Sequence, residues 1–177
     1  MKSFLVLLLI GLTIPVSHVA APSEAQSPPT IDEIVLEAKA GLKLTSPGGF
    51  YGTGFKVTFQ RDGTALYAGS RDVKLIGSYQ GTISADEFEK LVKFVNARDY
   101  SQIPDDPLTA SRTADEAEDV LKPRMTTTIT YKGGGQKKIS RLAELNPLDR
   151  EKVPKALFEI EQAILDASAR IKWREVE

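Results

Sequence analysis

The residue types that most often carry catalysis are scarce in this chain of 177 residues. It has no cysteine, and its single histidine, His18, lies in an apolar segment near the N-terminus. Without imidazole or thiolate elsewhere, the chain builds neither a Ser-His-Asp triad, a cysteine nucleophile nor a His- or Cys-ligated zinc or copper site. Catalysis would require carboxylates, a Ser-Lys pair or tyrosine. We therefore predict no cofactor and no metal site.

A glycine-rich segment with two adjacent aromatic residues, at 48–54, is the first place to look for a ligand. Its backbone N–H groups could bind an anion, and its rings could contact a sugar. A phosphate loop of the P-loop type is excluded, because such a loop ends in Gly-Lys-Ser/Thr before a helix. A turn that needs positive φ at its glycines also explains this composition, and we favour that interpretation. Binding residues concentrate on loops held by strands, so the candidate ligand-binding residues are Phe50, Tyr51 and Thr53.

Three threonines, Thr126, Thr128 and Thr130, alternate along a predicted strand and should project from one face of it. Such a row could present hydroxyls to a flat partner or to ordered water. β-Branched threonine is also common on the solvent face of a half-buried strand, and this is the interpretation that we favour.

Two charged clusters are better explained as solvated surface than as sites. The acidic residues at 115–119 lack the Asp-x-Asp-x-Asp-Gly order of a calcium loop. Basic residues surround a predicted hairpin at 124–142, without the interleaved aromatic residues that bind single-stranded nucleic acid. With 23 basic and 24 acidic residues overall, we expect no nucleic-acid partner. An acidic surface of a partner protein would suit the basic cluster better, and an ordinary charged edge strand explains it more simply.

The N-terminal residues predict export. Lys2 precedes an apolar run at 4–16, and small residues follow, which is the order of a signal peptide. The run is shorter than the roughly 20 residues of a membrane-spanning helix. We therefore expect residues 1–25 to be a cleavable signal peptide and leader, cut near 21 or 25. The mature protein would be periplasmic or secreted and soluble, with no membrane span, and its oligomeric state is left open.

Residues 30–173 should form a single α+β domain, because 41% hydrophobic and 27% charged residues are typical of globular chains. Apolar alternation predicts a first strand at about 30–39, a hairpin at 55–68 around Asp62-Gly63, and a third strand at 72–80. A second hairpin is predicted from strands at 124–132 and 136–142.

Two amphipathic helices complete the predicted domain. Ser84 and Glu87 form a capping box before a helix that should end near Asp99. Apolar residues at three- and four-residue spacing predict a second helix at 154–172. Between them, Thr113 and Glu116 could cap a short helical piece. We expect an antiparallel sheet of five to six strands, in the order β-meander, helix, β-hairpin, helix, with both long helices on one face.

The motifs at 49–54, the Asp62-Gly63 turn, the return at 67–69 and the segment 77–81 resemble a family of exported bacterial domains of unknown function. Its members pair an aromatic-Gly-Thr loop with a strand, a turn and a Tyr-x-Gly return, and the resemblance covers most of residues 31–168. Many members carry a cysteine pair flanking the loop, where this chain has Phe50, Gly54 and Phe55. A disulfide or thiol role is therefore not transferred.

The resemblance implies an exported domain but assigns no reaction, substrate or partner. Our leading hypothesis is a non-catalytic binding or accessory module of the bacterial cell envelope, whose partner is an envelope protein or a cell-wall component. The alternative is a hydrolase-type enzyme that uses carboxylate, Ser-Lys or Tyr groups. That alternative predicts a deep pocket where Tyr51, Tyr67 or Tyr79 meets Asp or Lys side chains.

Overall fold

The structure is a computed structural model that describes residues 29–39, 43–44, 50–51, 54–70, 73–108 and 123–176. For 43–44 and 50–51 it describes the backbone alone. The predicted signal peptide, Thr53, the predicted helical piece at Thr113 and the acidic cluster at 115–119 lie outside the described residues.

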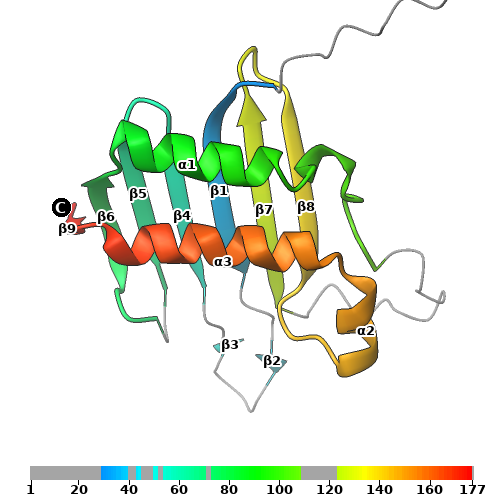
Figure 1. The fold of residues 1–177 in the computed structure, drawn as a ribbon. Coiled ribbons are helices and arrows are strands. Elements are labelled where there is room, and N and C mark those ends of the chain that lie inside the picture. Colours follow the sequence, from blue (N-terminus) through cyan, green and yellow to red (C-terminus); the bar gives the residue numbers. More distant parts are fainter. Residues whose placement is uncertain are drawn as a thin grey trace, which may run out of the picture.

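An antiparallel sheet of seven strands, in the order β8-β7-β1-β4-β5-β6-β9, forms one layer of the molecule (Figure 1). Its strands are β1 (Ile31–Lys39), β4 (Phe55–Gln60), β5 (Thr64–Gly69), β6 (Gly77–Thr82), β7 (Arg124–Tyr131), β8 (Gln136–Leu142) and β9 (Arg174–Glu175). Two short strands, β2 (Lys43–Leu44) and β3 (Phe50–Tyr51), pair separately. The predicted meander and second hairpin are thus present.

Strand β1 lies in the interior of the sheet because the two hairpins add to its opposite sides. Leu36 faces Val57 of β4 on one side and Thr127 of β7 on the other. Leu36 and Ile34 point to the same face, and both are fully buried. A central strand with neighbours on both sides has all its backbone groups paired, which suits this apolar segment.

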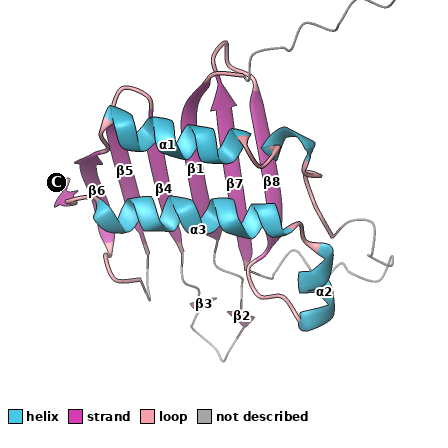
Figure 2. Ribbon diagram, viewed as in Figure 1, coloured by secondary structure: helices cyan, strands magenta, loops and turns pink. Residues whose placement is uncertain are grey.

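Two long helices, α1 (Ala85–Asn96) and α3 (Lys155–Arg170), cover one face of the sheet (Figure 2). Ser84 caps α1 by accepting a hydrogen bond from the backbone N–H of Glu87 at 3.2 Å, as the capping box predicted. The buried stripes fall at the predicted spacing: Phe88, Leu91, Val92 and Val95 on α1, and Leu157, Ile160, Ile164 and Ala167 on α3. The core lies between these stripes and the sheet.

Several expectations need correction. The main sheet has seven strands rather than five to six, because residues after α3 return to pair as β9. The strand expected at 72–80 is β6, at Gly77–Thr82, so the segment from Val73 to Ile76 precedes the strand. The short helices α2 (Pro147–Lys152) and η1 (Tyr100–Gln102) were not anticipated. Short elements carry too few residues for periodicity to show them.

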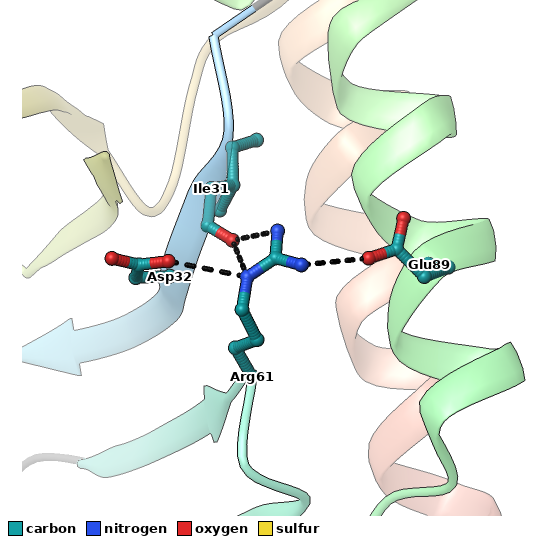
Figure 3. Close-up of polar contacts among 4 residues, drawn as sticks. All are labelled: Ile31, Asp32, Arg61 and Glu89. Atoms are coloured by element: carbon teal, nitrogen blue, oxygen red, sulfur yellow. Dashed lines mark hydrogen bonds and ion pairs between the residues drawn. The ribbon is translucent and has the colours of Figure 1, made fainter. Parts of the chain in front are cut away.

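Arg61, at the turn between β4 and β5, joins three elements (Figure 3). Its guanidinium donates to the backbone oxygen of Ile31 at 2.6 and 2.9 Å and pairs with Asp32 of β1. A third contact, at 2.9 Å, reaches Glu89 of α1. Each of the three guanidinium nitrogens donates to at least one of these partners, so we interpret this cluster as a structural clamp between the sheet and α1.

Thr127 of β7 gives a stability prediction with an unusual sign. Its side chain is fully buried, and its hydroxyl oxygen has no hydrogen-bond partner in the part of the chain that the structure describes. An unpaired buried hydroxyl costs free energy, so Thr127→Val should raise the free energy of unfolding by about 1 kcal/mol in urea denaturation.

Thr126 on the same strand is the matched control. It is also buried, but its hydroxyl lies 3.2 Å from that of Ser140. Thr126→Val should lower the free energy of unfolding by a similar amount, about 1 kcal/mol, because it leaves Ser140 without this bond. Equal effects of the two substitutions would contradict the assignment.

Candidate functional site

A hollow lies where β1 ends and β4 begins, at the end of the sheet nearest to β2 and β3 in Figure 1. We call it the rim hollow. Its volume is about 560 Å³, which lies in the range of small-molecule sites. It is lined by residues 37–39, 54–56, 68–70 and 77–78, so four strands contribute.

The floor of the rim hollow is mostly backbone. Ala38, Ala68 and Gly69 bring no side chain larger than a methyl group. At Gly69, a Cβ atom would lie 2.0 Å from the backbone oxygen of Leu75, so only glycine permits this crossing of the chain. At Gly69 the space is taken up by this crossing, whereas at Ala68 the short side chain leaves room that a ligand can enter.

Charged side chains stand at one side of the rim hollow. Glu37 of β1 lies directly opposite Lys56 of β4, and the carboxylate of Glu37 is 3.8 Å from the Nζ of Lys39. Lys56 is exposed and forms no ion pair with any residue that the structure describes. Two cations against one carboxylate leave this side with an excess of positive charge.

Hydroxyl groups lie at the other side. The Ser70 hydroxyl donates to the backbone oxygen of Gly54 at 2.9 Å, and the Ser70 N–H donates to the same oxygen at 2.8 Å. The Ser70 hydroxyl oxygen can still accept a hydrogen bond. Ser78 of β6 also lines the hollow and is exposed. The rim hollow therefore offers hydroxyl, ammonium and carboxylate groups.

An aromatic cluster begins at Phe55, at the edge of the rim hollow. The Phe55 ring stacks on Tyr67 with centroids 6.4 Å apart, and Tyr67 also contacts Tyr79 and Trp173 at 6.1 and 5.6 Å. Burial and the neighbouring Tyr79 raise the pKa of the Tyr67 phenol. Phe55, Tyr67 and Trp173 also pack against the hydrophobic core, so this cluster serves packing.

The pocket expected for a hydrolase is not found among the described residues. Tyr67 and Tyr79 do not line the rim hollow, and the Tyr79 hydroxyl donates to the backbone oxygen of Ile76 at 3.0 Å. The side chain of Tyr51 is not described. The described residues also contain no group of three or more His, Cys, Asp or Glu side chains placed to hold a metal ion.

The predicted ligand-binding residues lie in the segment that connects two sides of the rim hollow. Phe50 and Tyr51 form β3, paired through the backbone with β2, and Thr53 is outside the described residues. The segment begins after Lys39 and ends at Gly54, both of which line the hollow. Sequence reasoning noted the glycines and the loop but missed the lysines, because the register that places Lys56 opposite Glu37 is a tertiary feature.

The threonine row and the basic cluster do not form separate sites. Thr126 is buried beside Ser140, so the row is not uniformly solvent-facing. Two of the basic residues pair with carboxylates of the connection after α1: Arg124 with Asp106 and Lys137 with Asp105. Arg141 is buried against Glu161 of α3, so the basic residues around the hairpin do not share one patch.

Together these features define a class: a two-layer α+β domain with an open-faced antiparallel sheet and a ligand-sized hollow at the strand ends. A family model described as a domain of unknown function, DUF6438, matches residues 52–168. The chain belongs to this family. No curated protein matches the chain. Among the described residues, no helix is long and apolar enough to cross a membrane.

Proposed function

We propose that this protein is a non-catalytic binding module that holds a small polar ligand in the rim hollow. The observation that carries the proposal is the hollow itself: a backbone floor with ammonium, carboxylate and hydroxyl groups at its sides. A few polar groups around a concave surface are what orient a small ligand. Among the described residues that line the hollow, no serine hydroxyl is hydrogen-bonded to a general base, the arrangement that covalent hydrolase catalysis uses.

The proposal extends to the loop beside the hollow. Phe50, Tyr51 and Thr53 lie in the chain between Lys39 and Gly54, which both line the hollow. We propose that these three residues add contacts to the ligand. The support is their position in the chain, together with the tendency of binding residues to lie on loops held by strands.

We further propose that the protein is exported and acts as an accessory module of the bacterial cell envelope. The support is the order of Lys2, the apolar run at 4–16 and the small residues that follow. A ligand from the cell wall, or an envelope protein that presents such a ligand, would then be within reach. Fractionation of cells producing the chain should place the processed protein outside the cytoplasm, and an unprocessed cytoplasmic protein would contradict this part.

A thermal-shift screen tests the binding proposal. Sugars, cell-wall glycan fragments, divalent ions and nucleotides are added to the protein, and the unfolding midpoint is measured. A ligand that binds only the native state raises the midpoint, by an amount equivalent to about 2.7 kcal/mol at one hundred times its Kd. We expect a saturable rise of several degrees with at least one glycan fragment.

A variant that fills the hollow gives the screen its control. Ala68 is exposed and lines the hollow, so Ala68→Trp should block the ligand without disturbing the core, and the shift should vanish. Lys138→Trp places the same ring at an exposed position on β8, four strands from β5, and should leave the shift intact. A shift that survives in Ala68→Trp, or no shift with any compound, would refute a binding role for the hollow.

A further inference from the structure

We infer that the ligand of the rim hollow is a carboxylated saccharide, which rests on the proposed function and specifies its ligand. The first argument is charge. The side formed by β1 and β4 carries Lys39 and Lys56 against the single carboxylate of Glu37. Glu37 already has Lys39 at 3.8 Å, which leaves Lys56 as the cation without an ion-pair partner among the described residues.

The position of Lys56 makes it the anion contact. It lies directly across from Glu37 and, on its other side, across from Ala68. Ala68 is too small to cover the lysine stem, so the ammonium group can extend over the hollow. An ammonium group forms charge-assisted hydrogen bonds to a carboxylate, and these are about twice as strong as neutral hydrogen bonds.

The remaining lining favours a polyhydroxylated ligand over a simple carboxylic acid. Across the floor from Lys56, the Ser78 hydroxyl can donate to and accept from a sugar hydroxyl, and the Ser70 hydroxyl oxygen, whose proton is given to Gly54, can accept. The carboxylate of Glu37 is a further acceptor. A volume of about 560 Å³ exceeds that of a simple carboxylate and suits one or two sugar rings.

The apolar part of the lining fits the same ligand. The methyl group of Ala68 lies on the same face of the sheet as its paired residue Lys56, and it can contact the C–H face of a pyranose. The ring of Phe55 points to the opposite face, where it stacks on Tyr67. Charge, hydroxyl groups and a small apolar group thus occur together at one hollow.

Matched pairs of disaccharides test the inference by isothermal titration calorimetry on the purified protein. The muramic-acid-containing disaccharide GlcNAc-MurNAc differs from chitobiose, GlcNAc-GlcNAc, by one lactyl carboxylate. Digalacturonate and digalactose form a second pair, in which uronic-acid groups rather than a lactyl group carry the carboxylate. We expect one carboxylated member to bind about tenfold more tightly than its neutral counterpart, because one such charge-assisted contact is worth about 1.4 kcal/mol.

Lysine variants test which side chain causes the preference for the carboxylated disaccharide. Lys56→Gln should lower the affinity for the carboxylated disaccharide about tenfold, to that of the neutral one, and leave the neutral affinity unchanged. Lys138→Gln, which removes a charge from an exposed position on β8, should change neither affinity. The preference should also weaken as salt is raised, because exposed charges are screened.

The failures of the inference and of the proposed function are distinguishable. Equal affinity for both members of each pair, unchanged in Lys56→Gln, would overturn the carboxylate assignment and leave a neutral-sugar module. Binding of none of the four disaccharides, when the thermal-shift screen finds another ligand that Ala68→Trp excludes, would overturn the saccharide assignment alone. Failure of both experiments would overturn the proposed function as well.

Discussion

Arg141→Ala is expected to lower the free energy of unfolding by about 3–5 kcal/mol, the largest effect of any single substitution considered. Arg141 of β8 and Glu161 of α3 form a buried ion pair, with side chains 8% and 5% exposed. Three hydrogen bonds join the guanidinium to the carboxylate, and the free guanidinium nitrogen donates to the backbone oxygen of Leu142 at 2.7 Å. Alanine would leave the carboxylate of Glu161 buried without its partner.

The loss should depend on pH. Burial already raises the pKa of Glu161 above its usual value, and Arg141 opposes this shift. Without the arginine, the pKa of Glu161 in the folded state rises further, while in the unfolded state it stays near about 4.3. A carboxyl group whose pKa is higher in the folded than in the unfolded state contributes stability that is fully present below the unfolded-state pKa. This contribution is lost as the pH rises through the folded-state pKa. The stability deficit of Arg141→Ala should therefore be smaller at pH 4 than at pH 7 in urea denaturation.

A double variant separates the ion pair from simple loss of packing. In Arg141→Met/Glu161→Leu both charges are replaced by apolar groups of similar size, so no charge stays buried alone. Such replacements are often neutral or stabilising, and the double variant should recover most of the lost stability. If it is as unstable as Arg141→Ala at every pH, packing around Phe158, whose ring lies 4.7 Å from the guanidinium carbon, explains the effect instead.

The buried pair illustrates what patterning could and could not predict. The apolar stripe of α3 was readable from its spacing, since Leu157, Ile160 and Ile164 are fully buried. Glu161 lies beside that stripe, and glutamate is almost never fully buried unless it is paired. It is 4% exposed because Arg141, on the core-facing side of β8, is opposite it. Pairing between elements distant in sequence leaves no periodic signal.

The candidate site, too, could be predicted from the sequence only in part. The loop at 48–54 and the turn at Asp62-Gly63 could be recognised because turn chemistry is local. The rim hollow could not be recognised from the sequence, because it exists only where four strand ends meet. Lys56 belonged to the polar half of an alternating strand, with nothing to distinguish it from Thr58. Its significance comes from the register that places Ala68 on one side and Glu37 on the other.

The seventh strand depends on one glycine, and this gives the second prediction of large effect. After α3 the chain crosses β6 at Gly81 and then pairs as β9. A Cβ atom on Gly81 would lie 2.3 Å from Cγ2 of Ile171 and 3.4 Å from Cε3 of Trp173. Gly81→Ala should therefore push this segment off the sheet and lower the free energy of unfolding by about 1–3 kcal/mol.

Trp173 reports the displacement directly, because it is the one tryptophan of the chain. Its indole N–H donates to the backbone oxygen of Ser168 at 3.1 Å, and its ring packs on Tyr67. Both contacts shield the ring from water, so its fluorescence should shift to longer wavelength in Gly81→Ala. Adding Ile171→Leu removes the clashing Cγ2 methyl group but keeps the apolar volume, so it should restore the wild-type emission. A clash with the backbone oxygen of Lys172, 3.3 Å from the same Cβ position, would leave the emission shifted.

A second glycine supplies the matched control for the methyl group itself. Gly135, in the turn before β8, has no atom within 4 Å of the position that a Cβ would take, so Gly135→Ala should change neither stability nor emission appreciably. Unchanged emission in Gly81→Ala would mean that the C-terminal segment does not rest on Gly81. β9 is short: it pairs with β6 at Tyr79 and Gln80, and the Val176 N–H donates to the Ser78 oxygen at 2.9 Å. The packing of Ile171 and Trp173 at Gly81 adds to these contacts, and the predicted fluorescence shift follows from its loss.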